Sequence, residues 1–200
     1  MKYSFTLVLS VLVFTSIFFA ACKNDEAYTP KPMGYFRIDF PEKEYQSFDS
    51  ASFPYQFEYP VYADIVHENS VGSKDFWLNI NYPNYLGQVS LTYLPVYNSI
   101  DTLYKYTEDS YNFVSKHIPM ANDITPDIIQ DTLNNIYGLK YDIAGSSTAS
   151  PYQFFITDSC NHFLRASLHF YVLPNNDSLS PVINFIKEDL EHMIETMKWK

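Results

Sequence analysis

Glycine, cysteine and basic residues are all scarce in this sequence of 200 residues. It has five Gly and two Cys, and 13 Lys and Arg stand against 23 Asp and Glu, which gives a net charge of −10. With so few glycines, a glycine-rich loop that cradles phosphate is not expected. The surplus of acidic residues repels nucleic acid and anionic lipid headgroups, so neither is an expected partner.

Motifs for metal binding and catalysis are also missing. The sequence contains no H-E-x-x-H, no C-x-x-C, no aspartate-rich calcium loop and no G-x-S-x-G. His162 and His169 share a predicted strand, but their odd spacing places them on opposite faces of it. We therefore expect no metal site, no cofactor and no enzymatic activity.

The first 22 residues have the features of a bacterial lipoprotein signal. Lys2 precedes an apolar run over residues 5–19, and Ala20-Ala21-Cys22 follows it. We predict a signal peptide at 1–21 and lipidation of the Cys22 thiol, with labelled palmitate incorporated there. The alternative is a transmembrane helix, for which the run has about the minimum length. The alanine pair and the polar residues after Cys22 favour the lipoprotein.

Cleavage after residue 21 removes Lys2 and no acidic residue, so 12 basic and 23 acidic residues remain, a net charge of −11. Cys160 is then the only free thiol, in a predicted hairpin turn where we expect it to be inert. Residues 22–34 contain Pro30 and Pro32 and no apolar periodicity, which is typical of an extended tether. Residues 35–200 have the length of one globular domain.

Alternation of apolar and polar residues predicts most of the strands, and the 76–82 and 89–93 strands make the clearest hairpin. Asn98 or Ser99 can cap a helix that Pro119 stops, and Ser180 with Pro181 can open a second helix near the C-terminus. A short strand is expected around Ile128. The other predicted strands are 35–40, 55–59, 61–66, 136–144, 152–157 and 162–173.

Both predicted helices are amphipathic. The stripe of the first helix is Ile100, Leu103, Tyr111, Val114 and Ile118. The second carries Val182, Ile186, Leu190, Met193 and Met197 on its apolar side, and its expected outer side holds Lys187, Glu188, Asp189 and Glu191.

The order of elements is strands, helix, strands, helix, joined by hairpins. This order predicts an α+β fold with an antiparallel sheet flanked by helices. It resembles the α-β-α sandwich of the PsbP and Mog1 group.

Asp followed by a hydroxyl residue and a small or aliphatic residue occurs four times. This pattern resembles the O-glycosylation acceptor used on exported proteins of the Bacteroidota. Asp-Ser and Asp-Thr are also ordinary turn and cap residues, so both interpretations stay open. The candidate acceptors are Ser50, Thr102, Thr132 and Ser178.

The stretch from Tyr28 to Tyr45 resembles the start of the GldD family, the gliding motility-associated lipoproteins of Bacteroidota. In that family similar Pro-Lys-Pro, Gly-Tyr and Arg-Ile-Asp runs follow closely on a lipobox. Here they are Pro30-Lys31-Pro32, Gly34-Tyr35 and Arg37-Ile38-Asp39. The resemblance implies a non-enzymatic accessory of the gliding and type IX secretion machinery, which holds other proteins of that machinery at a membrane.

The resemblance also suggests a partner contact at Tyr35, Arg37 and Asp39, next to the tether. The alternative is local, with Arg37 and Asp39 paired to each other. We expect the protein to be lipid-anchored in the cell envelope and to face the periplasm, with the outer-membrane surface as the alternative. The competing function is a solute- or glycan-binding surface lipoprotein in which Trp77 and tyrosines stack on the ligand.

Overall fold

The computed structural model describes residues 37–68 and 75–200. The predicted signal peptide, Cys22, the tether and Tyr35 lie outside the described residues, so these predictions are untested. Within the described part of the chain, no helix is long and apolar enough to cross a membrane.

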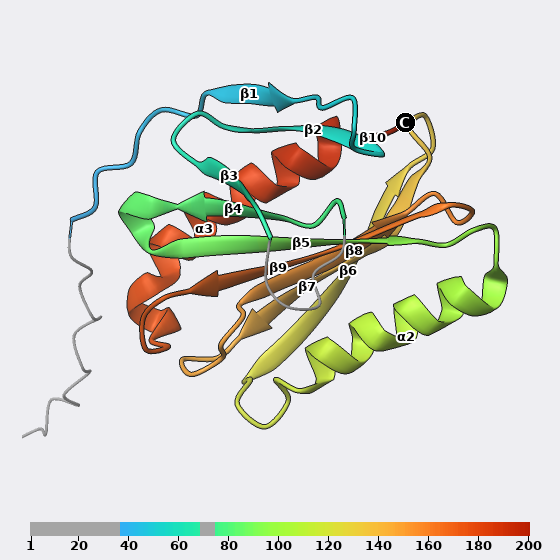
Figure 1. The fold of residues 1–200 in the computed structure, drawn as a ribbon. Helices are drawn as coiled ribbons and strands as arrows, with labels where there is room; N and C mark the ends of the chain where they lie inside the picture. Colours follow the sequence, from blue (N-terminus) through green and yellow to red (C-terminus); the bar gives the residue numbers. More distant parts are fainter. Residues whose placement is uncertain (1–36, 69–74) are drawn as a thin grey trace, which may run out of the picture. The chain divides into compact units, whose positions relative to one another are not determined.

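Two antiparallel sheets form the framework (Figure 1). The smaller one has the order β1 (Tyr45–Phe48), β2 (Tyr55–Pro60) and β10 (Lys198–Trp199). The larger one has seven strands, in the order β3 (Asp64–His67), β4 (Leu78–Tyr82), β5 (Gly87–Pro95), β9 (His162–Phe170), β8 (Tyr152–Thr157), β7 (Ile136–Ala144) and β6 (Asp123–Asp131).

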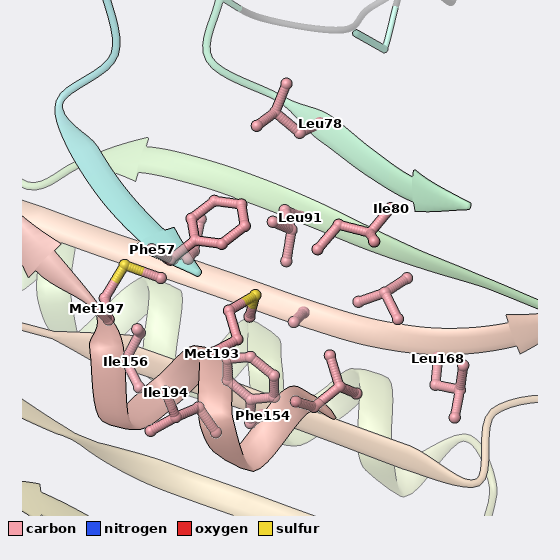
Figure 2. Packing of buried hydrophobic residues seen from close by; sticks show 14 of the residues in the cluster. Phe57, Leu78, Ile80, Leu91, Phe154, Ile156, Leu168, Met193, Ile194 and Met197 are labelled. Atoms are coloured by element: carbon pink, nitrogen blue, oxygen red, sulfur yellow. The ribbon is translucent and has the colours of Figure 1, made fainter. Parts of the chain in front are cut away.

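Helix α3 (Asn176–Thr196) and the small sheet pack against one face of the large sheet, and this interface holds the main core. Figure 2 shows Met193 of α3 and Met197, directly after this helix, beside Phe57 of β2 and Phe154 of β8. Every second residue of the central strands points into this layer, as the period of two in a strand requires. Burial of these apolar side chains is the main term that stabilises the domain.

Helix α2 (Ile100–Ser115) lies on the opposite face, over β8 and β9 (Figure 1). Its core is smaller and includes Val114 of the helix with Tyr141, Phe155 and Phe163 of the sheet. Ser99 caps the helix, because its hydroxyl accepts the N–H of Thr102 at 3.2 Å. The two helices thus cover both faces of one antiparallel sheet.

The predicted α+β class, with an antiparallel sheet flanked by helices, is confirmed. Strands β7 and β8 have the predicted bounds, and β4 and β5 form the predicted hairpin through the short helix η1 (Pro83–Tyr85). Alternation is clearest in β5, where every second residue faces the main core, whereas all six residues of β8 are buried because a core lies on each of its faces. The turn before β9 is also confirmed, since Asp158 Oδ1 accepts the N–H groups of Cys160, Asn161 and His162.

The predicted strand at 35–40 is wrong over its described part, residues 37–40, which have no regular structure. The first strand is β1 instead, which pairs with β2. Phe40 packs against α3 through its aromatic ring without belonging to a strand. The alternation of apolar residues in this segment therefore did not indicate a strand. The predicted strand at 61–66 is interrupted as well, by a turn at 61–63 that precedes β3.

The first helix is shorter than predicted, and of its predicted stripe only Leu103 and Val114 pack against the sheet. It ends at Ser115, and Ile100, Tyr111 and Ile118 of the predicted stripe are exposed. At 3.6 residues per turn Ile100 and Tyr111 share one direction, about a quarter-turn away from the buried side that contains Ser110 and Val114, and Ile118 lies beyond the helix. The apolar residues therefore formed two stripes, of which only one faces the sheet.

Three strand and helix bounds also differ from the predictions. The short strand expected around Ile128 is the nine-residue β6, and β9 ends at Phe170. Helix α3 starts at Asn176, so Ser180 is not its cap and Pro181 lies inside it. The helix starts earlier because Asn176 anchors it to the loop between β7 and β8, with its side-chain amide donating to Gly145 O and Thr148 O at 2.9 Å each.

Candidate functional site

Arg37 and Asp39, the described residues of the predicted partner contact, form a local ion pair. Arg37 Nε lies 3.0 Å from Asp39 Oδ1, and the two side chains are 89% and 81% exposed. An ion pair this exposed adds little to stability. The geometry fits the local alternative and leaves both side chains accessible to a partner, so the contact stays a prediction.

The residues that follow this pair fasten the chain to α3. The Phe40 ring stacks on Phe185 of α3, with 4.4 Å between ring centroids. Three residues later, the Lys43 ammonium lies 2.7 Å from Asp189 Oδ1 and donates to Phe185 O at 2.5 Å. The Asp189 side chain has no exposed surface, whereas that of Lys43 is 25% exposed. A buried carboxylate is stable only when it is paired and hydrogen-bonded.

Tyrosine hydroxyls supply the remaining hydrogen bonds to Asp189. Tyr62 donates to the carboxylate at 2.8 and 2.9 Å, and Tyr45 donates at 3.1 Å. Burial and the neighbouring carboxylate raise the pKa of Tyr62, Tyr45 and Tyr82 above the ordinary value of 10.0. The Tyr62 and Tyr45 hydroxyls therefore remain protonated donors to Asp189, whereas the buried Tyr82 hydroxyl has no hydrogen-bond partner among the described residues. We call the set Phe40, Lys43, Tyr45, Tyr62, Phe185 and Asp189 the N-terminal lock.

A second contact lies beside the lock. The Tyr45 ring stacks on His192 of α3 with a centroid separation of 3.7 Å, and His192 Nε2 lies 2.7 Å from Glu58 Oε2. Strands β1 and β2 are thus tied to the same helix as Lys43. Together these contacts hold the segment after the predicted tether rigidly against the domain.

The expected outer position of Asp189 is wrong, because the side chain is buried. A signal for this was present in the sequence. Asp189 follows Ile186 by three residues and precedes Met193 by four, so it lies on the apolar stripe of α3. A charged residue on such a stripe predicts a buried partner, and Lys43 and the tyrosines are its partners.

The opposite end of the large sheet carries a different kind of site. Strand β6 is the end strand there, and a cavity of about 360 Å³ opens between it and α2. Its walls are mostly apolar, with Asp123, Asn122 and Ser115 as polar members. The lining residues come from α2, the loop after it, β6 and β7, and they include Tyr111, Val114, Ile118, Ile124, Pro126 and Tyr141. We call this space the apolar cavity.

A second cavity, of about 450 Å³, lies beside the same strand on the α3 face of the sheet. Lys140 Nζ lies 2.8 Å from Glu191 Oε2 and 3.5 Å from Asp127 Oδ2, while Lys187 pairs with Asp142. Tyr152 donates to Glu191 Oε1 at 2.5 Å. We call this space the charged cavity. Pro126 lines both cavities, so they flank one point on β6.

The four candidate glycosylation residues differ in accessibility. Thr132 and Ser178 are exposed, in a turn and in the first turn of α3. Ser50 and Thr102 are half-buried, and their hydroxyls contact Ser52 and Ser99. Asp131 forms a turn by accepting the N–H of Leu133, which fits the turn interpretation of its motif. Modification stays a prediction for all four candidates.

The other singled-out side chains have structural contacts. Cys160 is exposed in its turn. His162 stacks on Trp199 and contacts Tyr93, whereas His169 contacts Ser167, so the two histidines lie on opposite faces of β9. Among the described residues, no group of three or more His, Cys, Asp or Glu could hold a metal ion.

Trp77, proposed as a stacking platform for a glycan, packs partly buried against the main core. Its indole N–H donates to Tyr93 O at 2.9 Å. The indole is therefore committed to the fold, and no observation here favours the glycan-binding alternative.

The described residues thus form an α+β domain with a closed contact at its N-terminal end and an open sheet edge at β6. The family model of the gliding motility lipoprotein GldD matches residues 25–199. The chain therefore belongs to this family, as its N-terminal motif predicted. Membership makes it a lipoprotein of the cell envelope, associated with a membrane and with gliding motility.

A comparison with curated proteins gave no match. A similar solved structure is the solution structure of cyanobacterial PsbP (CyanoP) from Synechocystis sp. PCC 6803, with 12% identity over 84% of this chain and 99% of that chain, at a TM-score of 0.45. At this TM-score the likeness carries no argument about function.

Proposed function

We propose that this protein is a non-enzymatic accessory of the gliding motility and type IX secretion machinery. In this role it is anchored by lipid at Cys22 and holds other proteins of the machinery at the membrane, on the periplasmic side. The observation that carries the proposal is the family match over residues 25–199.

The N-terminal lock supports the scaffold role. A scaffold on a lipid anchor needs the segment after the anchor to be fixed to the folded domain. Lys43 and Tyr45 provide this by binding the buried Asp189 of α3. The domain is thereby held at a defined attachment point while the residues before it remain available as a tether.

The non-enzymatic role is supported by what the titratable side chains do. The Asp189 carboxylate is held by a lysine and two tyrosines, and the Asp158 carboxylate accepts three backbone N–H groups. His192 is held between Glu58 and Tyr45. These titratable groups are therefore engaged in contacts that stabilise the fold of the chain itself.

The proposal is tested by deleting the gene in the native host and restoring it in two forms. The wild-type chain should restore gliding and the export of type IX cargo, and Cys22→Ser should fail to incorporate labelled palmitate and fail to restore either process. Copurification from detergent extracts should recover secretion-machinery proteins with the wild-type chain. A deletion strain that glides and exports normally contradicts the proposal.

A further inference from the structure

The open edge of β6 has backbone groups that another strand could use. Ile143 of β7 donates its N–H to Pro151 O, on the side of β8, and Ile143 is paired with Ile124 of β6. In an antiparallel ladder successive residues direct their backbone groups to opposite sides. Ile124 and every second residue after it therefore point away from β7. The β6 residues whose backbone groups point toward the open edge are Ile124, Pro126, Ile128 and Gln130.

This edge is partly protected against indiscriminate strand addition. Pro126 has no N–H to donate, and the N–H of Ile128 is already accepted by Asp127 Oδ1 at 2.9 Å. Ile128 is nevertheless 71% exposed, and its carbonyl and that of Pro126 remain as acceptors along the edge. An added strand must therefore provide donors for these carbonyls and must displace Asp127 from Ile128.

The two cavities match the geometry of an added strand. Successive side chains of a strand point to opposite faces of the sheet, and the apolar and charged cavities lie on opposite faces beside Pro126. Peptides that extend a sheet gain affinity from backbone hydrogen bonds and specificity from pockets for alternate side chains. An apolar side chain fits the α2 face, and a polar or charged neighbour fits the α3 face.

The negative charge of β6 favours a basic strand as the one that adds to its edge. Asp123 and Asp127 lie on the same face of β6, no basic residue occurs in the strand, and the whole chain has a net charge of −10. A Lys or Arg opposite Asp127 would draw its carboxylate away from the N–H of Ile128 and free this donor. A second copy is disfavoured, because a two-fold pairing of β6 with itself gathers the aspartates of both copies on one face.

We propose that the β6 edge is a docking site for an extended, basic segment of a partner protein, which adds as a strand and inserts one apolar side chain into the apolar cavity. The inference rests on the proposed function, since it supplies the contact through which the scaffold would hold another protein.

The test begins with photo-crosslinking in native cells that express the full chain. A photoreactive benzoylphenylalanine replaces Ile128, and the matched control replaces Val66, which is exposed on β3 at the opposite edge of the same sheet. The proposal expects an adduct from position 128 but not from position 66. Mass spectrometry should place the contact in a segment that carries Lys or Arg next to an apolar residue.

A synthetic peptide with the sequence of that contact segment is then titrated against the purified full chain. Asp127→Asn should weaken binding by about tenfold, the equivalent of about 1.4 kcal/mol, whereas Asp64→Asn on β3 should leave affinity within about twofold. Ser115→Trp fills the apolar cavity and should reduce affinity by about tenfold or more, and Asn112→Trp on the exposed side of α2 should not. Melting temperatures confirm that each variant is folded.

Four outcomes overturn the proposal: equal adducts at both positions, an adduct with a second copy, an acidic or helical contact segment, or affinity unchanged by Asp127→Asn and Ser115→Trp. The proposed function fails separately. A deletion strain with normal gliding and export contradicts that function even where the basic segment binds β6, and a defective deletion strain without the adduct contradicts only the docking site.

Discussion

The N-terminal lock holds a fully buried carboxylate, whereas the β6 edge carries a mostly exposed one. In the lock, Asp189 is enclosed and all of its contacts come from this chain. At the edge, Asp127 is 68% exposed and shares its oxygens between Lys140 and a backbone N–H that faces outward. The lock thus stabilises the fold, whereas the contacts of Asp127 at the edge can be replaced by contacts with a partner. The following experiments separate these roles.

Removing the central carboxylate should give the largest effect. Asp189→Ala leaves the Lys43 ammonium and two tyrosine hydroxyls without their acceptor. We expect the free energy of unfolding to fall by about 3–5 kcal/mol, measured by urea denaturation. Glu188→Ala is the control for an exposed partner of the same lysine, since its carboxylate lies 3.5 Å from Lys43 Nζ, and the loss should stay below about 1 kcal/mol. Equal losses would show that the lock is not a distinct stabilising contact.

Loss of one donor should have an intermediate effect. Tyr62→Phe removes the hydroxyl that contacts both oxygens of Asp189, and a hydrogen bond to a charged group is worth about 1.5–3 kcal/mol. The decrease in unfolding free energy should fall in this range. Tyr104→Phe on the exposed side of α2 is the control and should be neutral.

The lock should also weaken at alkaline pH. Burial and Asp189 raise the pKa of Tyr62, so above about pH 10 the unfolded chain loses this proton while the folded chain keeps it. The stabilisation that the protonated Tyr62 hydroxyl gives to the folded state is complete below pH 10 and is lost as the pH rises above it. Thermal unfolding between pH 8 and 11 should show a falling melting temperature, and Tyr62→Phe should make the fall less steep. An unchanged slope would contradict the assigned protonation.

At the β6 edge, substitutions should change association more than stability. Pro126→Val with Asp127→Val restores a donor and frees the N–H of Ile128. We expect stability to change by less than about 1 kcal/mol, while light scattering detects self-association. Asp64→Val on β3 is the control and should remain monomeric. A monomeric double variant would show that these residues do not protect the edge.

The exposed ion pair should give the smallest structural effect. Arg37→Glu should leave protein level and melting temperature unchanged, because both side chains lie in solvent. If the predicted partner contact is correct, the same variant abolishes gliding. Complementation of the deletion strain measures motility, and immunoblotting measures protein level. A loss of the protein itself would support a structural role for Arg37.

The sequence predicted best those elements whose residue pattern follows from local packing and turns alone. Turns bound β7 and β8 on both sides and both strands pack against a core, so their bounds were predictable. Asp189 was misplaced because charge was given more weight than its position on the apolar stripe. Its partners Lys43 and Tyr45 are more than 140 residues away, a pairing that local periodicity does not contain.

The β6 edge was underestimated for a related reason. Asp123, Pro126 and Asp127 interrupt the apolar pattern, so the sequence indicated only a short strand around Ile128. Pairing with β7 extends β6 to nine residues despite the proline, because an end strand tolerates a missing donor on its open side. The cavities depend on where α2 and α3 pack, which only the assembled fold determines.

The small sheet joins both ends of the described chain, because β1 and the C-terminal β10 flank β2. A mechanical pull applied at Arg37 would therefore load α3 and this sheet first, through the Lys43–Asp189 contact. Strand β6, at the far edge of the large sheet, would be loaded only after the force had passed through the strands between it and the small sheet. If the chain is anchored and binds a partner as proposed, tension on the anchor is borne by the lock and the small sheet, and the partner at the β6 edge stays bound.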